Sequence, residues 1–245
     1  MTGKVSPKIF RLCSLSLLLL VIGCRREAGL AGVRMGVSRE CQGLGFTAQT
    51  ISPAAGIQEI ESGRLDVVVG PFSDVLLAAA EGKHIVAFGL VRQTRLALVT
   101  KTPARTMEEL AGQQVRVPGA GTLAHQFLNL LVSEVSLVGD FVNVVTTPAA
   151  NEVVRWEEAA GRTVIADSTA KLGAPLPECV LYASQDWLRR HRDLARVLAA
   201  RARPLKPESV EAMRKLVQAS YQRARLLAED LNAFYTNRFV PPGVE

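Results

Sequence analysis

The chain has 245 residues, of which 48% are hydrophobic and 5% aromatic, and its formal net charge is +6. Three of the positive charges, on Lys4, Lys8 and Arg11, precede residue 24, and no acidic residue does, so the rest of the chain carries only +3. Because the chain has no dense Lys/Arg run interleaved with aromatic residues, the composition argues against nucleic-acid binding.

The N-terminus has the pattern of an export signal. The basic residues are followed by an apolar run over residues 12–22, which is shorter than the roughly 20 residues that span a bilayer. Residues 21–24, Val-Ile-Gly-Cys, resemble a lipobox, in which the cysteine is acylated after cleavage. We therefore predict a signal peptide over residues 1–23, a lipid anchor on Cys24 and a linker over 24–32. The alternative is an ordinary signal followed by an incidental cysteine. Either way the chain is exported, to the periplasm or the cell surface.

Strands and helices alternate over the first two-thirds of the chain, and the remainder is nearly all helical. This order predicts an α/β fold with largely parallel sheets. Strands are predicted at 33–37, 46–51, 65–69, 85–90, 96–100, 115–117, 141–145, 163–166 and 180–183. Helices are predicted at 57–62, 74–81, 106–112, 122–131, 151–160, 185–190, 193–203 and 207–227, with residues 171–177 as a loop.

Two glycine-containing turns join a strand to a helix and are candidates for binding. In the first, Gly70 and Pro71 follow a buried strand, and Ser73 is expected to cap the next helix. In the second, Gly121 precedes Thr122, the expected N-cap of a helix whose free N–H groups attract anions. His125 lies one turn into that helix and would add positive charge when protonated. An ordinary strand–turn–helix connection is the alternative at both places.

Two cysteines remain beyond the predicted anchor, Cys41 and Cys179. An oxidising compartment permits a bridge between them, but their spacing leaves the pairing open, and two isolated cysteines form no metal motif.

The order of several motifs resembles a family of binding proteins. Residues 60–71 (IESGRLDVVVGP), 81–83 (EGK), 107–117 (MEELAGQQVRV), 179–183 (CVLYA) and 186–188 (DWL) carry the resemblance. The family is the periplasmic substrate-binding proteins of ABC transporters for sulfonates, nitrate, taurine and thiamine-type pyrimidines.

The resemblance implies a type 2 periplasmic-binding-protein architecture with two α/β lobes. Lobe one would comprise residues 33–100 and 175–245, lobe two residues 101–174, and the strands at 97–100 and 180–183 would cross between them. A small anionic or polar solute would bind in the cleft, and a permease in the inner membrane would receive it. The implied ligand-binding residues are Gly70, Pro71, Ser73, Gly121, Thr122 and His125, with Ala55 and Gly56 as weaker candidates. The protein is expected to be a monomer without cofactor, metal or catalytic residues.

The chain departs from the family in two places. The segments after the first strand and after residue 156 are short, and the mature chain is roughly 60–80 residues shorter than a full member. Two alternatives therefore stand beside a transport protein. One is a docking or sensory lipoprotein that transports no ligand. The other is a pyrimidine-synthesising enzyme, which the isolated histidines and the lack of a cysteine cluster disfavour.

Overall fold

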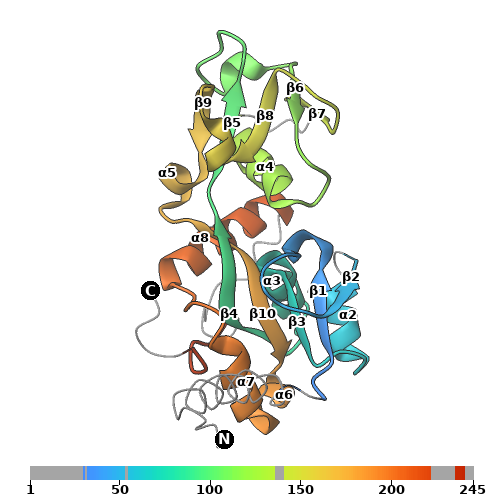
Figure 1. Ribbon diagram of the computed structural model, residues 1–245. Coiled ribbons are helices and arrows are strands. Elements are labelled where there is room, and N and C mark those ends of the chain that lie inside the picture. The colour runs from blue at the N-terminus through green and yellow to red at the C-terminus, as the bar shows by residue number, and fades with distance from the viewer. Residues whose placement is uncertain (1–29, 31, 53–54, 136–140, 222–234, 241–245) are drawn as a thin grey trace, which may run out of the picture.

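The computed structural model describes residues 30, 32–52, 55–135, 141–221 and 235–240. The predicted signal peptide and Cys24 lie outside these residues. The described part forms two five-stranded sheets, each with its own helices, stacked end to end (Figure 1). No helix among the described residues is long and apolar enough to cross a bilayer.

The first sheet has the strand order β2-β1-β3-β10-β4. Its strands are β1 (Met35–Ser38), β2 (Gln49–Ile51), β3 (Val67–Pro71), β4 (Ile85–Thr94) and β10 (Leu176–Ser184). The first lobe consists of this sheet with η1 (Arg39–Cys41), α2 (Ala55–Glu61), α3 (Phe72–Ala80), α6 (Gln185–Arg190), α7 (Arg192–Ala199) and α8 (Pro207–Tyr221). Strands β2, β1 and β3 run parallel, whereas β10 is antiparallel to both β3 and β4.

The second sheet repeats this arrangement with the order β7-β6-β8-β5-β9. Its strands are β5 (Leu96–Thr100), β6 (Gln114–Arg116), β7 (Asn143–Val145), β8 (Asn151–Arg155) and β9 (Thr163–Asp167). With η2 (Glu108–Leu110), α4 (Leu123–Val135), η3 (Trp156–Ala159) and α5 (Ser168–Leu172) they form the second lobe. Strand β5 is antiparallel to β8 and β9. The α/β class is therefore confirmed, but both sheets are mixed rather than largely parallel.

Two connections cross between the lobes. One is Arg95, which separates β4 from β5; its guanidinium pairs with Asp167 and lies 3.4 Å from the centre of the Trp156 ring. The other is the segment between α5 and β10. The predicted boundary at residue 100 was wrong, because β5 pairs only with strands of the second sheet.

Three further assignments differ from the sequence prediction. Residues 151–155 form strand β8 rather than a capped helix, because their buried side chains pair with β5 in the sheet interior. Residues 168–172, partly predicted as loop, form α5, which Asp167 caps by accepting the N–H of Thr169. Ser73 does not cap α3, because the helix already begins at Phe72.

The core runs through both lobes as one continuous apolar cluster. It includes Val68 of β3, Leu98 of β5, Phe127 of α4 and Met213 of α8. A second cluster covers the opposite face of the first sheet beneath α6 and α7. Helix α8 joins the lobes directly, since the Ser220 hydroxyl donates to the carbonyl of Gln126 in α4 at 3.1 Å.

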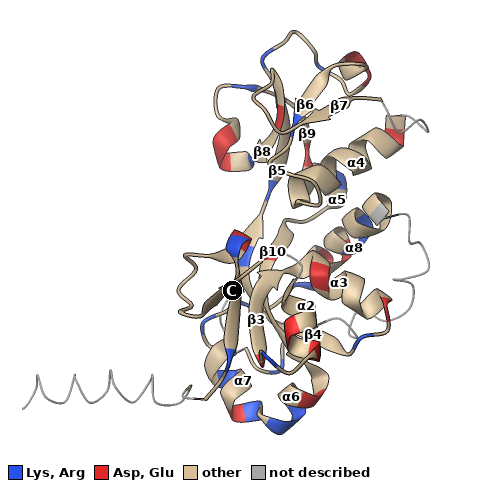
Figure 2. Ribbon diagram, turned by 90° about the vertical axis from the view of Figure 1, so that its right-hand side faces the viewer, with Lys and Arg blue, Asp and Glu red and all other residues tan. Residues whose placement is uncertain are grey.

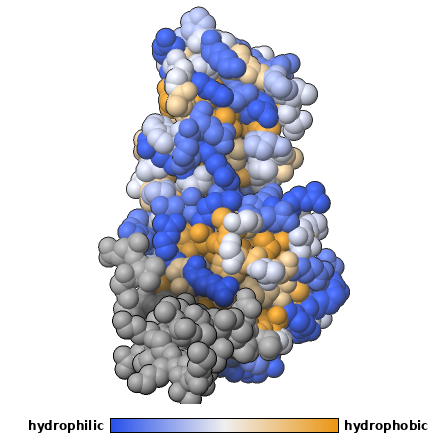
Figure 3. Space-filling view, viewed as in Figure 1, coloured by the Kyte–Doolittle hydropathy of each residue, from blue (hydrophilic) through white to orange (hydrophobic). Residues whose placement is uncertain are grey.

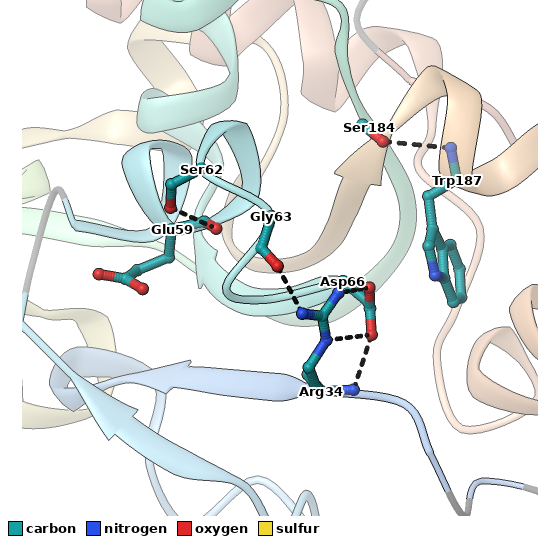
Figure 4. Close-up of polar contacts among 7 residues, drawn as sticks. All are labelled: Arg34, Glu59, Ser62, Gly63, Asp66, Ser184 and Trp187. Atoms are coloured by element: carbon teal, nitrogen blue, oxygen red, sulfur yellow. Dashed lines mark hydrogen bonds and ion pairs between the residues drawn. The ribbon is translucent and has the colours of Figure 1, made fainter.

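Polar and covalent links hold the ends of the first sheet. The Arg34 guanidinium binds both carboxylate oxygens of Asp66 and the carbonyl of Gly63, where β1 and β3 begin (Figure 4). Cys41 and Cys179, whose pairing the sequence left open, form a disulfide that joins η1 to β10. Both cysteines are buried. Because their neighbours Glu40 and Glu178 line the cavity between the lobes, the bridge holds the segment after β1 close to the lobe junction.

Candidate binding site between the two lobes

A cavity of about 350 Å³ lies where the two lobes meet. That volume is within the range of pockets that hold small molecules. The first lobe contributes Glu40, Thr94 and Glu178, and the second contributes Leu96, Arg116, Pro118, residues 122–124, residues 152–155 and Glu158. In the view of Figure 3, the surface at the level of this junction is mostly hydrophilic.

Glu178 is the centre of an ion-pair group that connects the lobes. Its carboxylate accepts hydrogen bonds from Arg92 Nε and from Arg155 Nη2, both at 2.7 Å. Arg92 also donates through Nη2 to the carbonyl of Glu40 at 2.6 Å. Since Arg155 ends β8 and Glu178 lies in β10, the second of these pairs spans the junction.

Glu152 is the centre of a second group, which lies within the second lobe. It accepts from Arg162 Nη1 at 2.8 Å and from Arg116 Nη1 at 3.3 Å. Burial by itself would raise the pKa of Glu152, but the hydrogen bonds from Arg162 and Arg116 outweigh it, and the pKa is lowered. The carboxylate is therefore charged and binds both guanidinium groups, of which Arg116 belongs to the cavity wall.

Two carboxylates of the cavity lack such partners. Among the described residues, neither Glu40 nor Glu158 has a side-chain hydrogen bond or ion pair. The pKa of Glu40 is raised by burial and by the charge of Glu178, with Arg92 offsetting part of the effect. A positively charged group of a ligand would relieve this repulsion.

The N-terminus of helix α4 forms one wall of the cavity. The Thr122 hydroxyl accepts the N–H of His125 at 3.3 Å and donates to the carbonyl of Gly119 at 2.8 Å. His125 Nδ1 in turn accepts the N–H of Gly121 at 3.0 Å. The arrangement resembles a capping box, but His125 accepts from Gly121, the residue before the N-cap, and not from Thr122 itself. Leu123 and Ala124, which carry the first N–H groups of the helix, are lining residues of the cavity.

The predicted residues of lobe one lie elsewhere. Gly70, Pro71, Ser73, Ala55 and Gly56 are not part of the cavity wall. Ser73 is 5% exposed. Of the residues predicted in lobe two, Thr122 lines the cavity, whereas Gly121 and His125 are not among its lining residues. Ligand contact by any of these residues stays a prediction.

The two glycines of lobe one have a packing role. A Cβ at Gly56 would lie 2.0 Å from the Tyr182 hydroxyl oxygen, and one at Gly70 would lie 3.0 Å from the same ring. Tyr182 is 1% exposed. Glycine is therefore required at these positions of α2 and β3 to make room for the tyrosine of β10.

The charged residues of the cavity were missed by sequence reasoning. Assigning residues 151–160 to a helix hid Glu152 and Arg155. The position of Arg155 at the carboxyl end of a strand is the signal that could have found it. Arg92 and Glu178 are separated by 86 residues, and no local pattern links them. Among the described residues no group of three His, Cys, Asp or Glu side chains could hold a metal ion.

Among known families, sequences and solved structures, only solved structures match the chain. No protein-family profile and no curated protein sequence matches the chain. Solved structures do match. A putative periplasmic sulfonate-binding protein from Methylobacillus flagellatus has a TM-score of 0.56 and 14% identity over 79% of this chain and 79% of its own. The periplasmic aliphatic sulphonate-binding protein SsuA from Escherichia coli has a TM-score of 0.54 and 12% identity, over 87% and 94%.

A third similar structure is the ligand-binding component of an ABC-type import system from Staphylococcus aureus, solved with zinc bound. Its TM-score is 0.53 and its identity 10%, over 87% of this chain and 98% of its own. At these identities the likeness concerns architecture. The chain has the two-lobe α/β fold of the periplasmic binding proteins, with a helical C-terminal part.

Proposed function

We propose that this protein is a lipid-anchored solute-binding component of an ABC importer, which binds a small solute between its lobes and delivers it to a permease. The observation that carries the proposal is the cavity walled by both lobes, with ionic residues at its surface. Such a site encloses a ligand when the lobes approach each other, and the closed form is what a permease would recognise. The similar sulfonate-binding and import proteins support the same role.

The walls favour a solute with both a negative and a positive group. The N–H groups of Leu123 and Ala124 suit an anionic end such as a sulfonate. Glu40 and Glu158 line the same cavity, and their carboxylates have no hydrogen bond or ion pair among the described residues, so they suit an ammonium group. Of the sulfonate, nitrate, taurine and pyrimidine-like solutes that the resemblance implies, we therefore propose an amino-sulfonate of the taurine type.

Isothermal titration of residues 24–245 with taurine, ethanesulfonate, nitrate and a hydroxymethyl-aminopyrimidine tests this proposal. Ethanesulfonate is the matched probe because it differs from taurine only in lacking the amine. We expect taurine to bind at least about tenfold more tightly than ethanesulfonate, and Glu158→Gln to reduce that preference. Equal binding of the two sulfonates would refute the ammonium site while leaving the sulfonate site in place.

A docking or sensory lipoprotein that transports no ligand is the second candidate. It is favoured by one observation: the arginines of the cavity are already paired, Arg155 with Glu178 and Arg116 with Glu152. If no tested solute gives heat in the titration or raises the melting temperature, the docking or sensory role would be supported.

The anchor is tested separately. We expect radiolabelled palmitate to be incorporated into the wild-type chain and not into Cys24→Ala, which would leave the membrane fraction. Unlabelled wild-type protein released as a soluble species would instead indicate an ordinary signal peptide.

A further inference from the structure

The end of the first lobe farthest from the second lobe is rich in arginine. Helices α6 and α7 carry Arg189, Arg190, Arg192 and Arg196, and the segment 235–240 adds Arg238; all five are exposed. Figure 2 shows this concentration of basic residues on α6 and α7. The acidic residues of the two helices are Asp186 and Asp193. The five arginines, including Arg238, therefore exceed these acidic residues by three. We call these five arginines the basic end.

The basic end surrounds a hollow of about 670 Å³ between α6, α7 and the segment 235–240. Arg189, Arg192, Arg196 and Arg238 line it together with Asn237, and Leu188 and Phe239 supply apolar surface. Guanidinium groups above apolar surface match the chemistry of a phosphate-bearing head group joined to an acyl chain.

The arginines of the basic end form only weak ion pairs, or none, among the described residues. Arg189 and Arg196 pair with Asp186 and Asp193 at 3.3 Å and 3.0 Å, and these aspartates are 76% and 94% exposed. Exposed pairs of this kind contribute little energy and are easily exchanged. Within the described part of the chain, the side chains of Arg192 and Arg238 have no hydrogen bond or ion pair. The arginines of the interlobe cavity, in contrast, are held by Glu152 and Glu178.

The N-terminal part of the described chain reaches the first lobe at this same end. Leu30 and Val33 pack against the apolar cluster that contains Trp187 and Leu188 of α6 and that Phe239 joins. Cys24 precedes Leu30 by six residues, a length that spans at most about 20 Å when fully extended. A lipid on Cys24, which belongs to the proposed function, would therefore hold the basic end close to the bilayer.

We propose that the basic end docks on an anionic phospholipid surface, with lipid phosphate groups between Arg189, Arg192, Arg196 and Arg238. A single lipid chain or a few basic residues bind a membrane weakly, whereas the two together hold a protein on it. Docking by this end points the second lobe away from the bilayer and leaves the interlobe cavity open to solvent.

Vesicle sedimentation with residues 25–245, which lack the acylated cysteine, measures the basic end by itself. The vesicles contain phosphatidylcholine either alone or with about 30% phosphatidylglycerol, at an ionic strength of about 0.05 M. The test variant is Arg189→Gln/Arg192→Gln/Arg196→Gln. The control, Lys101→Gln/Arg105→Gln/Lys171→Gln, removes the same charge from exposed positions of the second lobe.

We expect binding to the anionic vesicles only, a loss of about tenfold or more in the test variant, and little change in the control. Equal losses in the two variants would overturn the proposal in favour of attraction by net charge. Equal binding to both kinds of vesicle would overturn it as well, because such binding would not depend on lipid charge. Calorimetry with pyrophosphate distinguishes a lipid surface from a soluble phosphorylated ligand. Tight binding of pyrophosphate would assign the hollow to the soluble ligand and overturn the proposal. A negative result with the vesicles would not affect the interpretation of the solute titration, because neither variant changes a residue of the cavity between the lobes.

Discussion

Arg155 and Glu178 lie in different sheets and form an ion pair, with 2.7 Å between Arg155 Nη2 and Glu178 Oε1. The arginine ends β8 of the second lobe, and the glutamate lies near the start of β10, just after the chain returns to the first lobe. Their side chains are 43% and 18% exposed. This pair therefore joins the walls of the cavity at the junction between the two lobes.

Removing the pair should favour a more open arrangement. In Arg155→Gln, Glu178 keeps Arg92 as a partner, so the fold should persist while the contact between lobes weakens by about 0.5–1 kcal/mol. We expect an increased radius of gyration in small-angle X-ray scattering. Arg162→Gln is the matched control, because Arg162 pairs with Glu152 inside one lobe. An equal change in both variants would show that Arg155 does not restrain the lobes.

The capping arrangement of α4 should contribute to stability. Thr122→Ala removes the acceptor of the His125 N–H and should lower the free energy of unfolding by about 1 kcal/mol, whereas Thr122→Ser retains the hydroxyl and should lose much less. Urea denaturation measures both. An alanine variant as stable as the serine variant would mean that the hydroxyl does not cap the helix.

The disulfide should be a major stabilising element. Cys41 and Cys179 are 138 residues apart, and cross-linking a long loop restricts the unfolded chain by about 2–4 kcal/mol. We expect Cys41→Ser/Cys179→Ser to unfold at lower denaturant concentration and to be unaffected by dithiothreitol. The wild type should shift to the same midpoint on reduction. Because Glu40 and Glu178 flank the two cysteines, solute affinity should fall as well.

Asp74 should make stability decrease as pH rises. Burial, together with the charge of Glu40, raises the pKa of this α3 residue from the ordinary value of 3.8 to about 7. Between these values the folded state binds more protons than the unfolded state, so stability is lost through this range and the penalty is complete above pH 7. Asp74→Asn should therefore be more stable than the wild type by about 1 kcal/mol or more at pH 8, and nearly equal to it at pH 4. A difference that does not vary with pH would contradict the assignment.

Gly56 should not tolerate a side chain while Tyr182 is present. Alanine there would place Cβ 2.0 Å from the Tyr182 hydroxyl oxygen and 3.1 Å from its Cζ. We expect Gly56→Ala to lose about 1–3 kcal/mol in denaturant unfolding, and Tyr182→Phe in the same chain to restore part of it. Gly119→Ala is the control, since its nearest neighbour would be Thr122 Cγ2 at 3.7 Å. Full stability of Gly56→Ala would rule out close packing of α2 against Tyr182.

The sequence by itself determined most of the elements, because their signals are local. The apolar β-branched run that became β3, the glycine turn with Thr122 before α4 and the alternation of strands with helices were all readable from neighbouring residues. The order of motifs was enough for the two-lobe fold. Local patterns failed where pairing decided the outcome: residues 151–155 are a strand because β5 and β6 lie on either side of them.

Only the tertiary structure decided which side chains share a site. The predicted glycines of lobe one lie against Tyr182. The cavity is instead lined by charged residues from distant parts of the chain, such as Glu40, Arg155 and Glu178. The bridge between Cys41 and Cys179 was decided in the same way, when β10 returned to lie beside β3. Long-range ion pairs and disulfides depend on the meeting of distant segments, and no periodicity within one segment encodes that meeting.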